Sequence, residues 1–134
     1  MKIFIALFAS LFLSIIAHAA EPSPIYPFKV TIDGKVAEIV GDPTTAIFAK
    51  IADPVPADAL LEVEGEPGMI IINVFPTNEA GEVVSGAAPA ILMAQDTTKI
   101  KLDQTMDKSK IAPGLYLANI VYKSGTSRVM FTVK

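Results

Sequence analysis

The chain has 134 residues, with 11 basic and 14 acidic side chains, one histidine and no cysteine. The acidic balance argues against a nucleic-acid-binding protein, because such proteins attract phosphates with a basic surface. The lack of cysteine excludes disulfides, and a single histidine excludes the usual zinc, copper and haem ligand sets.

The first residues predict export. Lys2 is followed by an almost unbroken apolar run over residues 3–17, and Ala17-His18-Ala19 supplies the small residues that a signal peptidase reads. A membrane anchor is the alternative, but the run is shorter than the ~20 residues that span a bilayer, and the helix-hostile Glu21-Pro22-Ser23-Pro24 follows. Residues 1–19 are therefore predicted to be a cleaved signal peptide, which leaves a periplasmic or secreted protein without a transmembrane anchor.

After cleavage the chain is short enough for one domain. Residues 20–27 contain three prolines and predict an extended segment, which leaves residues 28–134 for the domain. Phe28–Ile32 alternates apolar and polar residues, as in a half-buried strand. Asp33-Gly34 then predicts a type I′ hairpin turn, whose central residues need positive φ, and residues 35–40 would return antiparallel.

The rest of the chain also reads as short strands separated by turns. Pro, Gly and Asn divide the segments, and β-branched residues are dense within them. The expected strands are 44–51, 60–64, 69–75, 82–84, 99–105, 115–123 and 128–134. Residues 85–94 fit a crossing loop, an edge strand or one helical turn. Outside the signal no segment has a helical apolar period, so the pattern predicts an all-β, antiparallel sandwich or barrel of about seven to nine strands.

Two stretches carry a resemblance to known domains. Residues 111–133 contain a Pro-Gly corner, a strand led by Tyr116, a Gly turn and a last strand ending Phe-Thr-Val. Residues 70–84 contain an apolar strand, an Asn…Gly turn and a Val-Val return. This resembles the ends and middle hairpins of bacterial immunoglobulin-like and fibronectin-III-like β-sandwiches. The resemblance implies an immunoglobulin-like fold and no particular function, because that architecture serves many roles.

The residues of the last hairpin also predict a core without that resemblance. Tyr116, Ala118 and Ile120 share one strand face, and Val129 and Phe131 share a face of the next strand. Tyr116 can bury its ring and return its hydroxyl to the backbone of the corner, as in a tyrosine corner.

Charge is divided between the two halves of the sequence. Residues 20–98 hold three basic and twelve acidic residues, whereas residues 99–134 hold seven basic and two acidic ones. A dipolar surface for an oriented partner is one interpretation. The simpler interpretation, which we favour, is that strands of the two halves pair and their charges complement one another.

No catalytic or metal-binding set is apparent. The only histidine, His18, lies in the signal peptide, which excludes Ser-His-Asp and Cys-His nucleophilic sites from the mature chain. The carboxylates of Glu62 and Glu64, or of Asp103 and Asp107, could form an acid–base pair, but such residues usually occupy exposed strand faces and turns. We expect no enzyme activity, no cofactor and no metal. The thioethers of Met69, Met93, Met106 and Met130 could bind Cu(I), although scattered methionines usually fill gaps in a core.

Two strands are apolar on both faces. An antiparallel sandwich strand normally has one polar, solvated face. Six residues lie opposite the expected core residues and form the candidate partner surface, namely Met69, Ile71, Phe75, Leu115, Leu117 and Val121. Either residues 87–94 fold over them or a partner covers them, as a second copy or another protein.

These features predict a non-enzymatic binding or structural module of the bacterial cell envelope. Its expected partner is a protein or a second copy of itself, bound through a sheet face, an edge strand or loops. Two alternatives remain open. A small-ligand or carbohydrate carrier would need an apolar pocket between the sheets, and an inhibitor would need a rigid exposed loop, such as residues 53–56 or 65–68.

Overall fold

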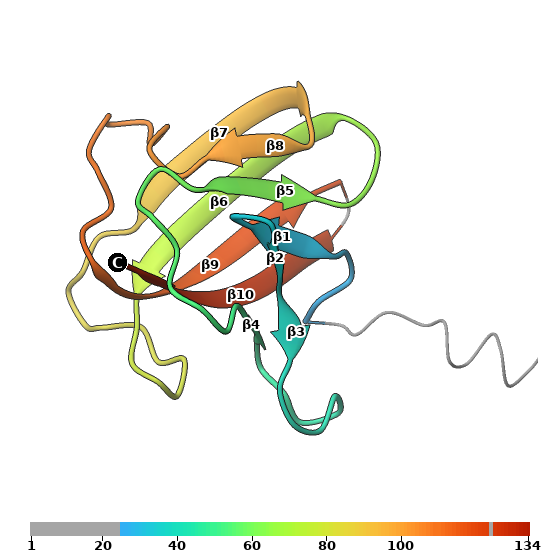
Figure 1. The fold of residues 1–134 in the computed structure, drawn as a ribbon, viewed down its shortest axis with the longest axis vertical. Helices are drawn as coiled ribbons and strands as arrows, with labels where there is room; N and C mark the ends of the chain where they lie inside the picture. Colours follow the sequence, from blue (N-terminus) through green and yellow to red (C-terminus); the bar gives the residue numbers. More distant parts are fainter. Residues whose placement is uncertain (1–24, 124) are drawn as a thin grey trace, which may run out of the picture.

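A computed structural model describes residues 25–123 and 125–134, which form two β-sheets packed face to face (Figure 1). The expected signal peptide and the start of the Pro-rich segment lie outside these residues. The described residues contain strands and no helix, as the sequence predicts. One sheet has the order β2-β1-β5-β8, with the bounds β1 Val30–Ile32, β2 Lys35–Val36, β5 Leu60–Val63 and β8 Lys99–Lys101.

The second sheet is larger and has the order β3-β4-β10-β9-β6-β7. Its strands are β3 Glu38–Ile39, β4 Ala49–Lys50, β6 Gly68–Pro76, β7 Ala90–Thr97, β9 Gly114–Tyr122 and β10 Gly125–Val133. All pairs in both sheets are antiparallel except β4 with β10, which is parallel. The described chain thus has ten strands, more than the seven to nine expected, and a mixed rather than purely antiparallel larger sheet.

The first hairpin forms as predicted, but its return strand is divided. Asp33 and Gly34 both adopt positive φ, at 56° and 74°, and Ile32 pairs with Lys35 across the turn. The expected strand 35–40 then splits at Ala37 between β2 in one sheet and β3 in the other. Ala37 is buried at this crossing. Its N–H donates to the carbonyl of Val30, and its carbonyl accepts from the Tyr26 hydroxyl at 2.8 Å, so the crossing leaves neither polar group unpaired.

Three other expected strands differ from the prediction. Residues 82–84 contain only an isolated bridge between Val83 and Thr77, and of residues 99–105 only Lys99–Lys101 form a strand. Of residues 44–51 only Ala49 and Lys50 are in a strand, and the residues before them form a loop. Residues 87–94 do not fold over the larger sheet. Most of them belong to β7, the edge strand of that sheet, and Leu92 of β7 is fully buried in the core.

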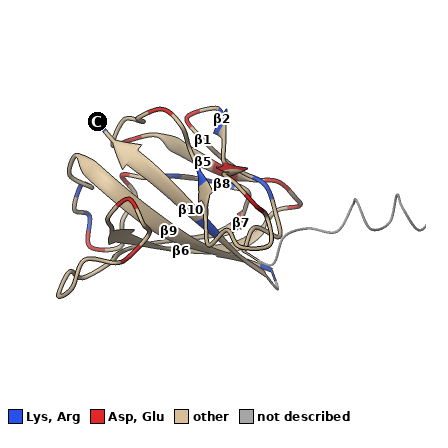
Figure 2. Cartoon of the chain, turned by 90° about the horizontal axis from the view of Figure 1, so that it is seen from below, with Lys and Arg blue, Asp and Glu red and all other residues tan. Residues whose placement is uncertain are grey.

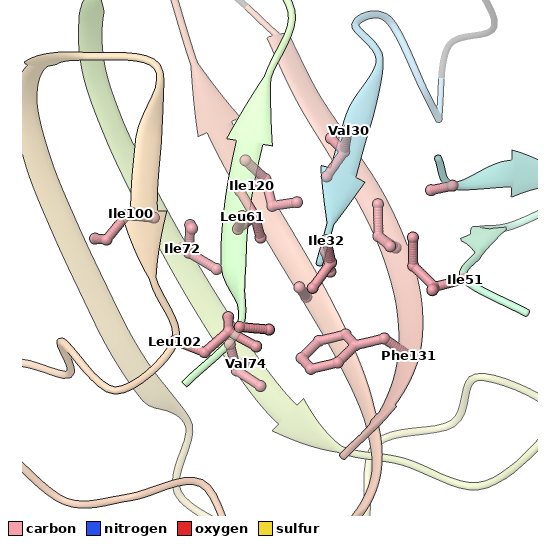
Figure 3. Packing of buried hydrophobic residues seen from close by; sticks show 14 of the residues in the cluster. Val30, Ile32, Ile51, Leu61, Ile72, Val74, Ile100, Leu102, Ile120 and Phe131 are labelled. Carbon is pink, nitrogen blue, oxygen red and sulfur yellow. The ribbon is translucent and has the colours of Figure 1, made fainter. Parts of the chain in front are cut away.

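The core lies between the two sheets and is built from alternate side chains of the facing strands (Figure 3). Ile72 and Val74 of β6, Ile120 of β9 and Phe131 of β10 point from the larger sheet toward Leu61 and Ile32 of the smaller one. The register places Ile72 opposite Ile120 and Phe131 opposite Tyr116. Because side chains alternate along a strand, this register fixes which residues of β6, β9 and β10 face away from the core.

Opposite charges pair across the two halves of the sequence. Glu62 of β5 lies directly opposite Lys99 of β8, and their side chains form an ion pair at 3.5 Å. Lys123 pairs with Glu66 at 3.9 Å. These contacts agree with charge complementation between neighbouring strands. Exposed pairs of this kind contribute little to stability.

Candidate interaction surface

The six residues of the predicted partner surface lie on one face of the molecule. Met69, Ile71 and Phe75 are on β6, and Leu115, Leu117 and Val121 are on the neighbouring β9. All point away from the core, because their alternate neighbours belong to it. The register sets Ile71 opposite Val121 and Phe75 opposite Leu117. The strands therefore bring the predicted residues together on the outer face of the larger sheet.

One end of this outer face is covered by the chain itself. Leu117 is fully buried, and so is Met130, which lies opposite it on β10. Neither belongs to the cluster between the sheets. A β-carbon added at Gly81 would lie 2.8 Å from the ring of Phe48, so these residues touch. Phe48 directly precedes β4, and Gly81 follows β6. Because β10 and β9 lie between those strands, and because Leu117 and Met130 are buried although they point away from the core, we infer that this contact covers them.

The covering segments were not those considered from the sequence. We infer that the loop over residues 40–48 and the hairpin loop over residues 77–83 cover this end of the outer face, whereas residues 87–94 do not. Leu117 is therefore not part of any exposed surface, a correction to the predicted set. Alternation along β9 shows that Leu117 points outward. It cannot show that a loop from a distant part of the sequence covers this side chain.

The other end of the outer face is bare. Met69 is 48% exposed, Val121 36% and Met93 44%, and Ile71 lies half-buried between the last two. The register pairs Ile71 with Met93 on one side and with Val121 on the other, so these side chains form a continuous row. Ile91, also exposed, lies two residues from Met93 on β7. We define the bare end as Met69, Ile71, Ile91, Met93 and Val121.

Sequence reasoning missed Ile91 and Met93, because their segment was considered as a cover. The signal that could have found them is the alternation Ile91-Leu92-Met93, which places one buried residue between two outward ones once the segment is a strand. The remaining predicted residues, Phe75 and Leu115, are half-buried toward the covered end.

A polar row separates the two ends. Asn73 of β6 lies opposite Asn119 of β9, and Asn119 lies opposite Arg128 of β10. All three face outward, because residues on both sides of each are buried. The side-chain oxygen of Asn119 is buried and has no hydrogen-bond partner among the described residues. Arg128 is the only charged residue of β6, β9 and β10, and Figure 2 shows these strands almost without charge colour.

The methionines do not mainly fill the core. Among the methionines of residues 25–134, Met69, Met93 and Met106 are exposed and Met130 is buried. Thr105 pairs with Leu92, and the Met106 N–H donates to the Ile91 carbonyl, so Met106 lies next to Ile91. Met93 is thus diagonal to both Met69 and Met106, which lie roughly 15 Å apart by standard strand geometry. One copper ion cannot reach all three thioethers. In the described part of the chain, no group of three His, Cys, Asp or Glu residues could hold a metal.

The carboxylates considered as a catalytic pair are engaged in ordinary surface contacts. Glu62 pairs with Lys99, and Glu64 pairs with Lys29 at 3.6 Å. Asp107 accepts hydrogen bonds from the hydroxyl and the backbone N–H of Ser109, which lower the pKa of its carboxyl.

Tyr116 forms the predicted corner. Its hydroxyl donates to the carbonyl of Ala112 at 2.6 Å, and its partial burial raises the pKa of the phenol. Its ring lies beside Phe131, with the ring centroids 6.0 Å apart. The role of Tyr116 is therefore structural.

An inhibitor would need a rigid exposed loop, and a small-ligand carrier would need a pocket between the sheets. In the loop 53–56, Val55 is fully buried and bridges to Val133, which holds this loop against β10. A cavity of about 430 Å³ lies between the loop 40–48 and Glu79-Ala80, outside the two-sheet core. Asp42 lines it, and hydrogen bonds from the backbone N–H and hydroxyl of Thr44 lower the pKa of Asp42.

Comparison of the chain with protein-family models and with curated protein sequences gave no match to either. Within residues 25–123 and 125–134, no helix has the length and apolar character needed to cross a membrane.

Proposed function

We propose that this protein is an exported, non-enzymatic binding module of the bacterial cell envelope that recognises a protein partner through the bare end of its larger sheet. The observation that carries this proposal is the row Met93–Ile71–Val121, which is continuous in register and open to solvent. Exposed apolar residues scattered singly need no explanation, whereas a contiguous group on one face is typical of an interaction site.

The chemistry of the surface favours a protein over a small molecule. Sites for small ligands are concave and enclose most of the ligand. None of the three described cavities is lined by a residue of the bare end. Exposed methionines also favour this choice, because their flexible side chains adapt to the apolar groups of a partner.

We further infer that the domain is immunoglobulin-like, which is finer than the two-sheet architecture itself. Three features support this. The N-terminal part contributes strands to both sheets, β4 runs parallel to the last strand, and the Tyr116 hydroxyl bonds the backbone of its corner. Export is inferred from residues 1–19 of the sequence.

The test replaces Ile71 and Met93 with lysine, singly and together. The matched control is Leu60→Lys, because Leu60 is an exposed apolar strand residue at 43%, but lies in the smaller sheet. We expect all variants to fold, as judged by circular dichroism. Binding to envelope proteins, measured by quantitative cross-linking, should fall with Ile71→Lys and Met93→Lys and be unchanged with Leu60→Lys.

Sedimentation equilibrium of the same variants distinguishes a second copy from another protein. A dimer that the lysine variants dissociate would make the partner a second copy. Equal cross-linking by the double variant, the control and the unmodified protein, without any change in oligomeric state, would refute the proposal.

A further inference from the structure

The polar row next to the bare end has hydrogen-bonding capacity that the chain does not use. Asn73, Asn119 and Arg128 are direct cross-strand neighbours on three adjacent strands, β6, β9 and β10. On the β7 side, the row continues to Ile91 of the bare end. A partner that covers the bare end therefore also reaches these polar side chains.

Asn119 lacks the hydrogen bond that a buried polar atom normally has. Its side-chain oxygen is shielded from water and has no partner among the described residues. Most buried polar atoms in folded proteins are paired, so an exception calls for an explanation. The same shielding keeps the donor groups of a docked partner away from this oxygen, so the contact of the polar row with a partner is made by Arg128.

Arg128 lacks an anionic partner within the described chain. The ion pairs of the described residues all use lysine, and none includes Arg128. A guanidinium group offers five N–H donors in a planar arrangement that suits a carboxylate. Arg128 is half-buried, and β6 and β9 contain no acidic residue that could satisfy it.

We propose that the partner contributes a segment in which an Asp or Glu stands beside apolar residues, with its carboxylate on Arg128 and its apolar side chains on the bare end. This inference rests on the proposed function and specifies the chemistry of its partner. A fatty acid would also offer a carboxylate and an apolar chain, but the bare end lines none of the three described cavities, which does not suit an enclosed acyl chain.

The experiment uses random linear peptides displayed on phage as the probe. Peptides are selected on the unmodified domain, and those that also bind the Ile71→Lys/Met93→Lys double variant are removed. We expect the remaining peptides to be enriched in Asp or Glu next to apolar residues. The affinity of a representative synthetic peptide should fall about tenfold with Arg128→Gln, because a charge-assisted contact is lost.

Matched variants separate this contact from general effects of charge. Lys50→Gln removes another outward charge from the same sheet and should change the affinity less than about twofold, because Lys50 lies beside Met130 of the covered end, on the side of β10 that is away from the bare end. Arg128→Lys keeps the charge but not the planar group, and should give an intermediate loss. A Glu→Gln change in the peptide should weaken binding to the unmodified domain and have no further effect on Arg128→Gln.

The outcomes distinguish the two proposals. Peptides that need Ile71 and Met93 but show no acidic enrichment, and bind Arg128→Gln normally, would overturn this inference and leave the proposed function standing. If no selected peptide depends on Ile71 and Met93, the proposed function fails and the acidic partner with it. If Arg128→Gln does not fold, two other measurements decide. An unchanged affinity of Arg128→Lys, together with an affinity that does not fall with added salt, would overturn the inference.

Discussion

Leu117 and Val121 lie four residues apart on the same strand and the same face, yet Leu117 is fully buried and Val121 is 36% exposed. Both were predicted to point outward from the alternation along β9, and both do. The difference comes from residues far away in the sequence, since Phe48 and Gly81 meet over the end that contains Leu117. An apolar outer face is thus not by itself an interaction surface, and only the part that the chain leaves open can receive a partner.

The largest expected effect concerns the buried member of this comparison. Leu117→Ala should lower the free energy of unfolding by about 2–5 kcal/mol, because it leaves a cavity beneath the covering loops. Val121→Ala should lower it by less than about 1 kcal/mol, because Val121 is already in contact with water. Equilibrium unfolding in urea measures both. Equal losses for the two variants would mean that the loops do not seal the covered end.

A glycine pair tests the contact that closes the covered end. Gly81 and Gly41 have nearly the same positive φ, 83° and 84°, but an added β-carbon meets Phe48 only at Gly81, and nothing within 4 Å at Gly41. The conformational strain of alanine, about 1–3 kcal/mol, should therefore be common to both variants. Gly81→Ala should cost about 1 kcal/mol more in urea unfolding, because the methyl group displaces the ring.

The control for this contact replaces the ring with a smaller side chain. Phe48→Leu in the Gly81→Ala background should recover some of the extra loss, giving a coupling that the Gly41→Ala background lacks. If Gly41→Ala and Gly81→Ala are equally destabilised, Phe48 does not press against the hairpin loop.

The local features of the fold could be predicted from the sequence. The turn at Asp33-Gly34, the long strands β6, β9 and β10, and the hydroxyl bond of Tyr116 each depend on residues that are close in sequence. Alternation then gave the buried residues Ile120 and Phe131 correctly.

The remaining features depend on contacts between distant segments. The split at Ala37 requires Tyr26 and Val30, and the short β4 gains its parallel partner only from the last strand of the chain. For the candidate surface, alternation identified Met69, Ile71 and Val121. Alternation could not show that Leu117 is buried while these three residues are not, because the loops over residues 40–48 and 77–83 bury it.

The smallest effect on stability, and the sharpest contrast between the two ends, is expected from methionine oxidation. Hydrogen peroxide transfers one oxygen atom to a thioether and is reduced to water, which converts an apolar side chain into a polar sulfoxide. Met69 and Met93 at the bare end, and the neighbouring Met106, should react much faster than Met130 beneath the loops, because only the first three are exposed. Mass spectrometry of peptides taken during the reaction measures each rate, and the unfolded protein in urea, where all four should react alike, is the control. The melting temperature should hardly change while the three exposed residues react, since each sulfoxide stays in water. Oxidation of Met130 as fast as Met93 in the folded protein would contradict this, because it would show that peroxide reaches the covered end as easily as the bare one.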